Sequence, residues 1–373
     1  MLRTLAALTA VLASAACGSS AAPGSISLPA TSGSHSASGS RVQAPVYGVM
    51  VDLLSDPAKY TISVVSWNGT VAAQFRAARR SLPPNPNGQA LELPYVGTTR
   101  TALYYLDGDS VVRRFTLGGP TDQAVTTLDV GTGAEAAFAV SPDDSRIAVA
   151  TLNFATLPVH VHIYTADLAG GNRHDVFDSD TDYVWPVAWR NGLLVLAHGY
   201  GPYVDAALKA APGQDNPYWA VSYHVVDPTN ASRKALVGQA CTVSGPLSPA
   251  GSACIQGGTV DWSGANTNWS TYNWGSISSA ASLSPDGSLV AAAPPEDQTR
   301  LTFYRRDGSI WYYVAGPGPR DWAGWLDATH LIVGSASDLT FQTRVVTLTS
   351  ITPALQYPDV HGFYAARLPA DIV

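Results

Sequence analysis

The stretch that decides the fold is AVSPDDSRIAVA (residues 139–150), and it returns about 140 residues later as SLSPDGSLVAAA (residues 282–293). Each copy has an apolar run, a Ser-Pro-Asp turn and a second apolar run of strand length. These residue types favour tight turns, because Pro presets the backbone and Asp accepts local backbone hydrogen bonds. Self-similarity of this kind indicates a repeat architecture, in which each unit packs against its neighbours.

The rest of the chain has the same rhythm. Short apolar runs recur about every 8–12 residues, with turn residues between them and no long helical periodicity. They group into about seven units of about 45 residues, the length of a four-stranded propeller blade. The sequence therefore predicts an all-β domain over residues 44–373, a single β-propeller of six or seven four-stranded blades. The unit between Cys241 and Trp274 is too irregular to decide between six and seven, and Val46–Met50 and His361–Ala366 are candidates for the ring-closing pair.

The turn motif resembles the WD-like repeats of the Tol-system propeller proteins and of bacterial surface lipoproteins. The clear copies are Ser141–Ala150 and Ser284–Ala293, and weaker copies begin at Trp189 and Trp325. The resemblance spans roughly residues 45–368. It implies a secreted or surface propeller that binds something. Because propellers carry many unrelated functions, the motif specifies the fold and not an activity.

The first residues predict export. Residues 1–16 combine a positive start with a short run of small apolar residues, which is typical of a signal peptide. Small residues before Cys17 resemble the lipobox of bacterial lipoproteins, in which the cysteine becomes the lipidated first residue; the alternative is ordinary cleavage after Ala16. Residues 17–43, rich in Ser, Gly and Ala, are predicted to be this lipidated cysteine and a flexible linker. The predicted location is the outer face of the cytoplasmic membrane, or secreted if Cys17 is not lipidated.

Two further cysteines fit an exported protein. Cys241 and Cys254 have 12 residues between them and are predicted to form a disulfide. Closing a loop of this size contributes about 3 kcal/mol in the chain-entropy model. A zinc site is the alternative, but no second cysteine pair or spaced histidine accompanies it.

Common catalytic signatures are missing. The sequence has no nucleophile elbow on a strand-to-helix turn, no His-Glu-x-x-His, no P-loop and no dinucleotide fingerprint. The formal net charge is −7, and adjacent basic residues form short pairs, such as Arg79-Arg80 and Arg305-Arg306, and no basic patch. A nucleic-acid partner is therefore not expected.

Two polar groups are weak candidates for a metal site, and no cofactor is predicted. Asp178, Asp180 and Asp182 alternate along one segment and offer oxygen ligands to Ca²⁺, although the Gly and the distal Glu of an EF-type loop are missing. The alternative is a solvated turn between blades. His160 and His162 share one face of a predicted strand and could begin a metal site. The alternative is a pair of polar positions on a half-exposed strand.

Aromatic residues mark the leading candidate for a ligand site. They are Trp219, Trp262, Trp269, Tyr272 and Trp274, and the last four lie among Asn, Ser, Thr and Gly where the repeat is least regular. Rings interleaved with polar groups make recognition surfaces. Irregular segments on a rigid scaffold are where binding tends to reside. The alternative is that several of these rings pack between blades.

These observations predict an envelope-anchored propeller lipoprotein that acts as a protein- or glycan-binding or assembly module. Its predicted partners are an envelope protein or a cell-wall glycan, with the membrane reached through the lipid anchor. The alternative is a polysaccharide-acting hydrolase or lyase with carboxylates at the propeller channel. Two carboxylates facing each other across a channel mouth, with raised pKa values, would favour the enzyme. An apolar, aromatic-lined face without such a pair would favour the binding module.

Overall fold

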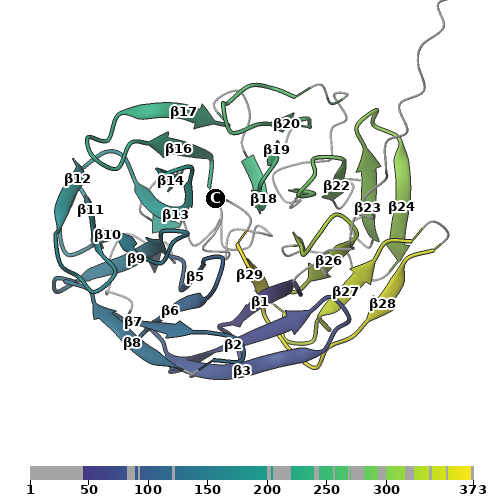
Figure 1. Ribbon diagram of the computed structural model, residues 1–373, viewed down its shortest axis with the longest axis horizontal. Coiled ribbons are helices and arrows are strands. Elements are labelled where there is room, and N and C mark those ends of the chain that lie inside the picture. Colours follow the sequence, from purple (N-terminus) through teal and green to yellow (C-terminus); the bar gives the residue numbers. More distant parts are fainter. Residues whose placement is uncertain are drawn as a thin grey trace, which may run out of the picture. The chain divides into compact units, whose positions relative to one another are not determined.

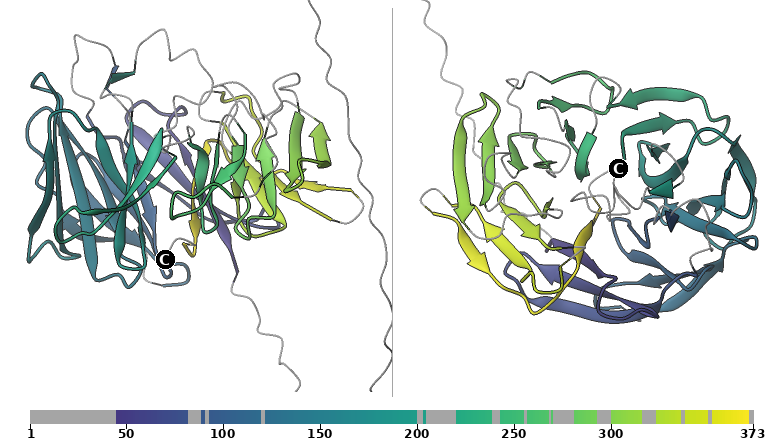
Figure 2. Two further views of the ribbon diagram at one scale, coloured as in Figure 1. Left: turned by 90° about the horizontal axis from the view of Figure 1, so that it is seen from above. Right: turned by 180° about the vertical axis from the view of Figure 1, so that it is seen from behind.

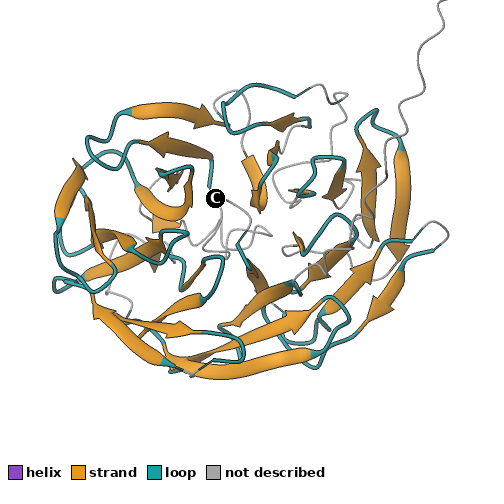
Figure 3. Ribbon diagram, viewed as in Figure 1, coloured by secondary structure: helices purple, strands orange, loops and turns teal. Residues whose placement is uncertain are grey.

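The structure is a computed structural model in which antiparallel sheets form a ring (Figure 1). It describes residues 45–81, 89–90, 93–119, 122–199, 203–204, 220–238, 243–254, 257–267, 269, 281–292, 300–315, 323–335, 338–349 and 352–370. The chain divides into the units Met1–Ala44 and Pro45–Val373, and all described residues belong to the second. Every regular element in those ranges is a strand (Figure 3). No helix among them is long and apolar enough to cross a membrane.

Seven sheets form the blades, and their order in the chain is their order in the ring. From the axis outward, blade 1 contains β29 (Phe363–Leu368), β1 (Tyr47–Asp52), β2 (Lys59–Ser66) and β3 (Val71–Ala78), and blade 2 contains β5 (Val96–Thr98), β6 (Leu103–Asp107), β7 (Val111–Phe115) and β8 (Gln123–Thr127). Blade 3 contains β9 (Ala134–Val140), β10 (Arg146–Asn153), β11 (His160–Asp167) and β12 (His174–Ser179). Blade 4 contains β13 (Val184–Arg190), β14 (Leu193–His198), β16 (Ser222–Val226) and β17 (Arg233–Val237). Blade 5 contains β18 (Val243–Ser248), β19 (Gly251–Cys254) and β20 (Thr259–Val260). Blade 6 contains β21 (Ala281–Leu283), β22 (Leu289–Ala292), β23 (Arg300–Arg305) and β24 (Ile310–Ala315). Blade 7 contains β25 (Ala323–Trp325), β26 (His330–Val333), β27 (Arg344–Thr347) and β28 (Ala354–Gln356). The predicted propeller is confirmed, and it has seven blades.

The ring closes by pairing its two ends. β29, the inner strand of blade 1, lies antiparallel to β1, from Tyr47 opposite Leu368 to Val51 opposite Phe363. This is the pairing expected from the sequence. A blade built from both ends of a chain closes the ring, so only the outer edges stay exposed.

The apolar core lies between neighbouring blades. Six clusters of buried side chains each join adjacent blades, and together they cover all seven blade-to-blade contacts. Between the inner strands of blades 7 and 1 this packing leaves no room for added atoms. A Cβ on Gly324 would lie 2.1 Å from the ring of Tyr364 in the neighbouring blade. A single blade leaves both apolar faces open, and stacking in a ring covers them.

The repeated turns use one hydrogen-bonding pattern. Ser141 Oγ donates to Asp143 Oδ1 at 2.6 Å and accepts from the Arg146 amide at 2.9 Å. Ser284 repeats both bonds with Asp286 and the Leu289 amide, at 2.6 and 2.9 Å. The side chains thus satisfy the turn's own polar groups, which is why the motif recurs where an inner strand reverses direction.

The blade that follows each of these turns is fastened to it by a tryptophan. Trp189 Nε1 in blade 4 donates to the Ala139 carbonyl of blade 3 at 3.1 Å. Trp325 Nε1 in blade 7 donates to the Ser282 carbonyl of blade 6 at 3.0 Å. Both carbonyls lie two residues before the turn serine. The turn and the tryptophan therefore act together to join consecutive blades.

Five outer strands carry a register shift against their inner neighbour. They are β3, β8, β12, β17 and β24. In β24, for example, Ile310 lies opposite Tyr304 and Tyr312 opposite Phe303, so Trp311 is the extra residue. Such bulges twist an edge and hinder pairing with another chain.

The ring has two unlike faces. The turns between the first and second strands of each blade, including both Ser-Pro-Asp turns, lie on one, which we call the pocket face. Connections between second and third strands lie at the other end of the antiparallel blades. From that opposite face β4 (Gln89–Ala90) and β15 (Tyr203–Val204) project and pair with each other (Figure 2). Two connections more than a hundred residues apart in the chain are thereby joined.

Candidate functional site

The inner strands converge on a pocket at the axis. Its volume is about 100 Å³, and all seven blades contribute to its lining. The described lining residues are Val96, Gly97, Thr98, Thr99, Val140, Pro142, Val187, Ala188, Trp189, Tyr223, Pro246, Leu247, Ser248, Pro249, Ser282, Leu283, Pro285, Trp325, Tyr364, Ala365, Ala366, Arg367 and Ala370. Because the carboxyl ends of the inner strands supply most of them, the pocket opens on the pocket face. Concave, mostly apolar sites with a few polar groups are typical of ligand pockets.

The lining is apolar and rigid. Four prolines contribute, and two of them, Pro142 and Pro285, belong to the repeated turns. The four aromatic rings in the lining are almost fully buried, with Trp325 only 4% and Tyr364 only 5% exposed. Rings buried to this degree expose little of their faces to the pocket. The pocket therefore suits a compact apolar group better than a sugar ring, which would need an exposed aromatic face or several polar partners.

Arg367 is the one charged side chain among the described lining residues. It is half-buried at the end of β29. Burial lowers the pKa of its guanidinium, and nearby Tyr364 and Asp327 act in the opposite direction. An incompletely solvated cation at the rim of an apolar pocket attracts an anionic or strongly polar group.

Two carboxylates that directly follow lining prolines are held by their own turns. Asp143 follows the lining residue Pro142, and hydrogen bonds from Ser141 and Ser145 lower its pKa to about 2. Asp286 follows Pro285; burial raises its pKa, but hydrogen bonds from Ser284 and Ser288 outweigh this and leave it lowered. No carboxylate belongs to the described lining. Neither aspartate is suited to donate a proton at neutral pH.

The predicted aromatic site is only partly within the described residues. Trp262 is 8% and Trp269 7% exposed, and both belong to core clusters. Trp262 Nε1 donates to the Ser248 carbonyl at 2.8 Å, which fixes the ring inside blade 5. Packing between blades is thus where the structure places these two rings. Trp219, Tyr272 and Trp274 lie outside the described residues.

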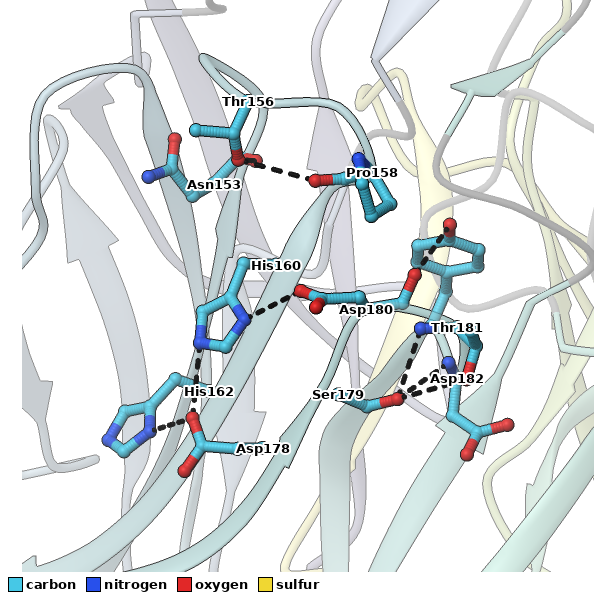
Figure 4. Close-up of polar contacts among 11 residues, drawn as sticks. Asn153, Thr156, Pro158, His160, His162, Asp178, Ser179, Asp180, Thr181 and Asp182 are labelled. Atoms are coloured by element: carbon cyan, nitrogen blue, oxygen red, sulfur yellow. Dashed lines mark hydrogen bonds and ion pairs between the residues drawn. The ribbon is translucent and has the colours of Figure 1, made fainter.

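The predicted metal candidates meet on the outer strands of blade 3 (Figure 4). Asp178 Oδ1 contacts His162 Nδ1 at 2.9 Å and His160 Nε2 at 3.1 Å. Asp180 Oδ1 contacts His160 Nδ1 at 2.9 Å. Hydrogen bonding to Asp180 is the main cause that raises the pKa of His160.

These contacts make an ion-pair network and not a coordination shell. Asp182 takes no part in it and instead donates its backbone amide to Ser179 Oγ. Across the described part of the chain, no group of three or more His, Cys, Asp or Glu side chains is arranged to hold a metal ion. Calcium at Asp178, Asp180 and Asp182 gains no support from this geometry.

The cysteine predictions fall largely outside the described ranges. Cys254 is 2% exposed in β19. Cys241 and Cys17 are not among the described residues. The disulfide and the lipidation therefore stay predictions.

The axial pocket was missed by the sequence reasoning. Its lining comes from seven separate strands, so no local motif contains it. One signal was present, because the prolines of both Ser-Pro-Asp turns line the pocket. In any propeller the turns that follow inner strands surround one mouth of the axis.

No protein-family model and no curated protein matches the chain. Solved structures do match, at low identity. An oligogalacturonate lyase in complex with manganese is 12% identical with a TM-score of 0.48, and the match covers 80% of this chain and 83% of that chain. The oligogalacturonate lyase of Vibrio parahaemolyticus is 11% identical with a TM-score of 0.46, covering 84% and 90%. A chain of the mitotic checkpoint complex is 12% identical with a TM-score of 0.48, covering 76% and 82%. Matches this remote carry no argument about activity.

Proposed function

We propose that this chain is a binding module whose axial pocket receives an apolar group of a protein partner. The observation that carries the proposal is the chemistry of the pocket: an apolar, proline-rich lining from all seven blades with no carboxylate among its described residues. A volume of about 100 Å³ admits one side chain of moderate size. Anchor side chains buried in a pocket dominate the energy of many protein interfaces.

The same chemistry disfavours a glycan-cleaving enzyme. Glycoside cleavage by the common mechanism needs an acid with a raised pKa and a second carboxylate close by. Asp143 and Asp286, which directly follow lining prolines, have lowered pKa values and are engaged in their turns.

Site-specific photo-crosslinking tests the proposal. A photoreactive phenylalanine analogue replaces Leu247, a half-buried lining residue of blade 5, in the full chain in its native envelope. We expect a crosslinked protein that disappears when Ala366→Phe fills the pocket. The control is Ala124→Phe, which adds the same ring to the exposed edge strand β8 and should leave the crosslink intact.

Two results would overturn the proposal. One is a crosslink that survives Ala366→Phe, because the partner would then not enter the pocket. The other is shortening of purified cell-wall polysaccharide by the intact protein but not by the pocket-filled variant, which would make the site catalytic.

We also propose that the module is exported and anchored at the outer face of the cytoplasmic membrane through Cys17. The support is the leader-like stretch 1–16, the small residues before Cys17 and the Ser/Gly/Ala-rich linker that follows. Mass spectrometry of the mature amino terminus should find an acylated Cys17. Cys17→Ser should release the protein from the membrane fraction, and an unmodified Cys17 in the mature protein would refute the anchor.

A further inference from the structure

The exposed apolar side chains are concentrated on one side of the ring. Among the described residues, the large hydrophobic side chains with substantial exposure are Leu54, Trp67, Val71, Leu157, Ile310, Tyr313, Leu339 and Tyr357. All except Leu157 belong to the consecutive blades 6, 7 and 1 or to connections within and between them. The most exposed rings are Tyr313 at 61%, Tyr357 at 51% and Trp67 at 46%. Monomeric proteins scatter such residues singly, so this concentration indicates an interaction surface.

The outer strand of blade 6 is the centre of this surface. β24 reads Ile-Trp-Tyr-Tyr-Val-Ala, without a charged residue, and within the described ranges it pairs only with β23. Tyr312 Oη donates to the Thr349 carbonyl of blade 7 at 2.7 Å, which ties β24 to the next blade. On the far side of blade 7, a Cβ on Gly69 of blade 1 would lie 2.8 Å from the Gln356 side chain. The three blades therefore present one continuous outer rim, which we call the aromatic rim.

Arginines accompany the aromatic rings of β24. The guanidinium carbon of Arg300 lies 5.4 Å from the centre of the Tyr313 ring, and that of Arg305 lies 5.5 Å from the Trp311 ring. Arg306 follows in the exposed turn, where Asp307 is the adjacent carboxylate. The described β23–β24 hairpin thus carries three arginines and one aspartate, while Asp338 and Asp359 lie beside Leu339 and near Tyr357 on the rest of the rim.

The opposite side of the ring is acidic. Blade 3 is separated from blade 6 by two blades in one direction and from blade 7 by two in the other (Figure 1). On it and the connection before it lie Asp129, Asp175, Asp178 and Asp180, with side chains 57–84% exposed. Arg173 lies among these aspartates and pairs with Asp129 and Asp175. The arginines of the β23–β24 hairpin and the acidic cluster of blade 3 therefore lie on opposite sides of the ring.

We propose that the aromatic rim lies on an anionic lipid surface. Tyr and Trp favour the headgroup region, where the ring is apolar and its polar tip stays wet. Arginines near an anionic membrane are each attracted by its surface potential, and the acidic cluster on the far side is repelled. The unpaired backbone amides of a bulged edge strand would be costly in hydrocarbon but can donate to headgroup phosphates, so the contact is interfacial.

The position of Pro45 supports a membrane as the surface that the rim contacts. The described residues begin at Pro45, directly before β1 of blade 1, which is one of the three rim blades. A linker such as the one predicted for residues 17–43 would restrict distance but not orientation. The rim supplies the orientation that a lipid anchor alone does not.

Vesicle sedimentation tests the rim without the anchor. The chain from residue 17 onward, with Cys17→Ser so that no acyl group is attached, is mixed with phosphatidylcholine vesicles with or without 30% phosphatidylglycerol. We expect binding to the anionic vesicles that weakens strongly at high salt. Arg305→Gln with Arg306→Gln should lower the partition roughly tenfold to thirtyfold. Ile310→Ser with Tyr313→Ser should lower it by about the same factor through lost apolar contact.

The control is Leu157→Ser, which removes the most exposed apolar side chain, at 65%, from the acidic side of the ring. It should leave vesicle binding unchanged. Equal binding by the rim variants, loss of binding in Leu157→Ser, or no binding of the parent chain to anionic vesicles would each overturn the proposal. Circular dichroism of every variant confirms that the propeller is intact. Ala366→Phe should not affect vesicle binding, so failure of the pocket proposal and failure of the rim proposal are separable.

Discussion

A buried ion pair joins the connection after blade 1 to the inner strand of blade 3. Arg80 Nη1 lies 3.1 Å from Glu135 Oε2, and the two side chains are 1% and 0% exposed. Arg80 Nη2 also donates to the carbonyls of Leu93 and Pro94 at 2.7 and 2.9 Å. Its guanidinium carbon lies 4.1 Å from the centre of the Tyr95 ring. One arginine therefore fastens the chain segment that leads into blade 2.

Removing one charge from this pair should strongly destabilise the propeller. We expect Glu135→Gln to lower the free energy of unfolding by about 3 kcal/mol, because buried Arg80 loses the charge of its carboxylate partner. Arg80→Met should cost about 4–5 kcal/mol, since it also removes two charged hydrogen bonds and the contact with Tyr95. Against a typical total stability of about 5–15 kcal/mol, either loss is large.

Guanidinium denaturation followed by tryptophan fluorescence measures these losses. The matched control is Arg76→Met, which breaks the ion pair with Asp56 on the surface, where the side chains are 50% and 28% exposed. Exposed pairs contribute about 0–1 kcal/mol, so this variant should unfold almost like the parent.

The double variant Arg80→Met with Glu135→Leu separates pairing from burial. It leaves no buried charge, so it should lose much less than the sum of the single variants. A loss below about 1 kcal/mol for Glu135→Gln, or additive losses in the double variant, would refute the argument that the pair acts as a unit.

Four further outcomes follow from the contacts described above. Trp325→Phe removes the indole donor to the Ser282 carbonyl and should cost about 1–2 kcal/mol of unfolding free energy in the same denaturation assay; an unchanged midpoint would contradict the interblade role. Asp286→Ala should cost about 1 kcal/mol, and Asp286→Asn less, because the amide oxygen still accepts the turn's hydrogen bonds. Burial lowers the pKa of His224 to about 4; since unfolding returns it to about 6.5, stability should fall as the pH drops from about 6.5 to 4, and His224→Gln should remove part of that slope. Cys254→Ser should cost about 2–5 kcal/mol if the predicted disulfide forms, and intact-mass analysis before and after reduction measures the disulfide directly.

The fold could be predicted because its determinants are local. The Ser-Pro-Asp turn satisfies its own polar groups with side chains only a few residues apart, as at Ser141 and Asp143. Its sequence therefore survives in repeats that have otherwise diverged. The blade number could not be predicted in the same way, because blade 5 has three short described strands and its turn between β18 and β19 reads Ser248-Pro249-Ala250-Gly251, with Ala in place of the Asp.

The candidate site was harder to predict because burial is a tertiary property. Trp262 and Trp269 lie among polar residues in the sequence, yet neighbouring blades cover them. The two histidines and the aspartates of blade 3 were singled out separately. Pairing β11 with β12 sets His162 directly opposite Asp178, so a hairpin register drawn from the sequence would have joined them.

A partner in the pocket and a membrane at the aromatic rim could be bound at the same time, because the pocket and the rim face perpendicular directions. The pocket opens along the axis, whereas β24 lies on the circumference. A propeller resting on blades 6, 7 and 1 would have its axis roughly parallel to the membrane plane. Its axial mouth would then face sideways along the surface, toward proteins held at the same membrane. In this orientation both faces of the ring stay open, and the propeller and a membrane-held partner meet by diffusion along the membrane. Vesicle binding should therefore raise the yield of pocket crosslinks to such a partner, and the same residue should form them.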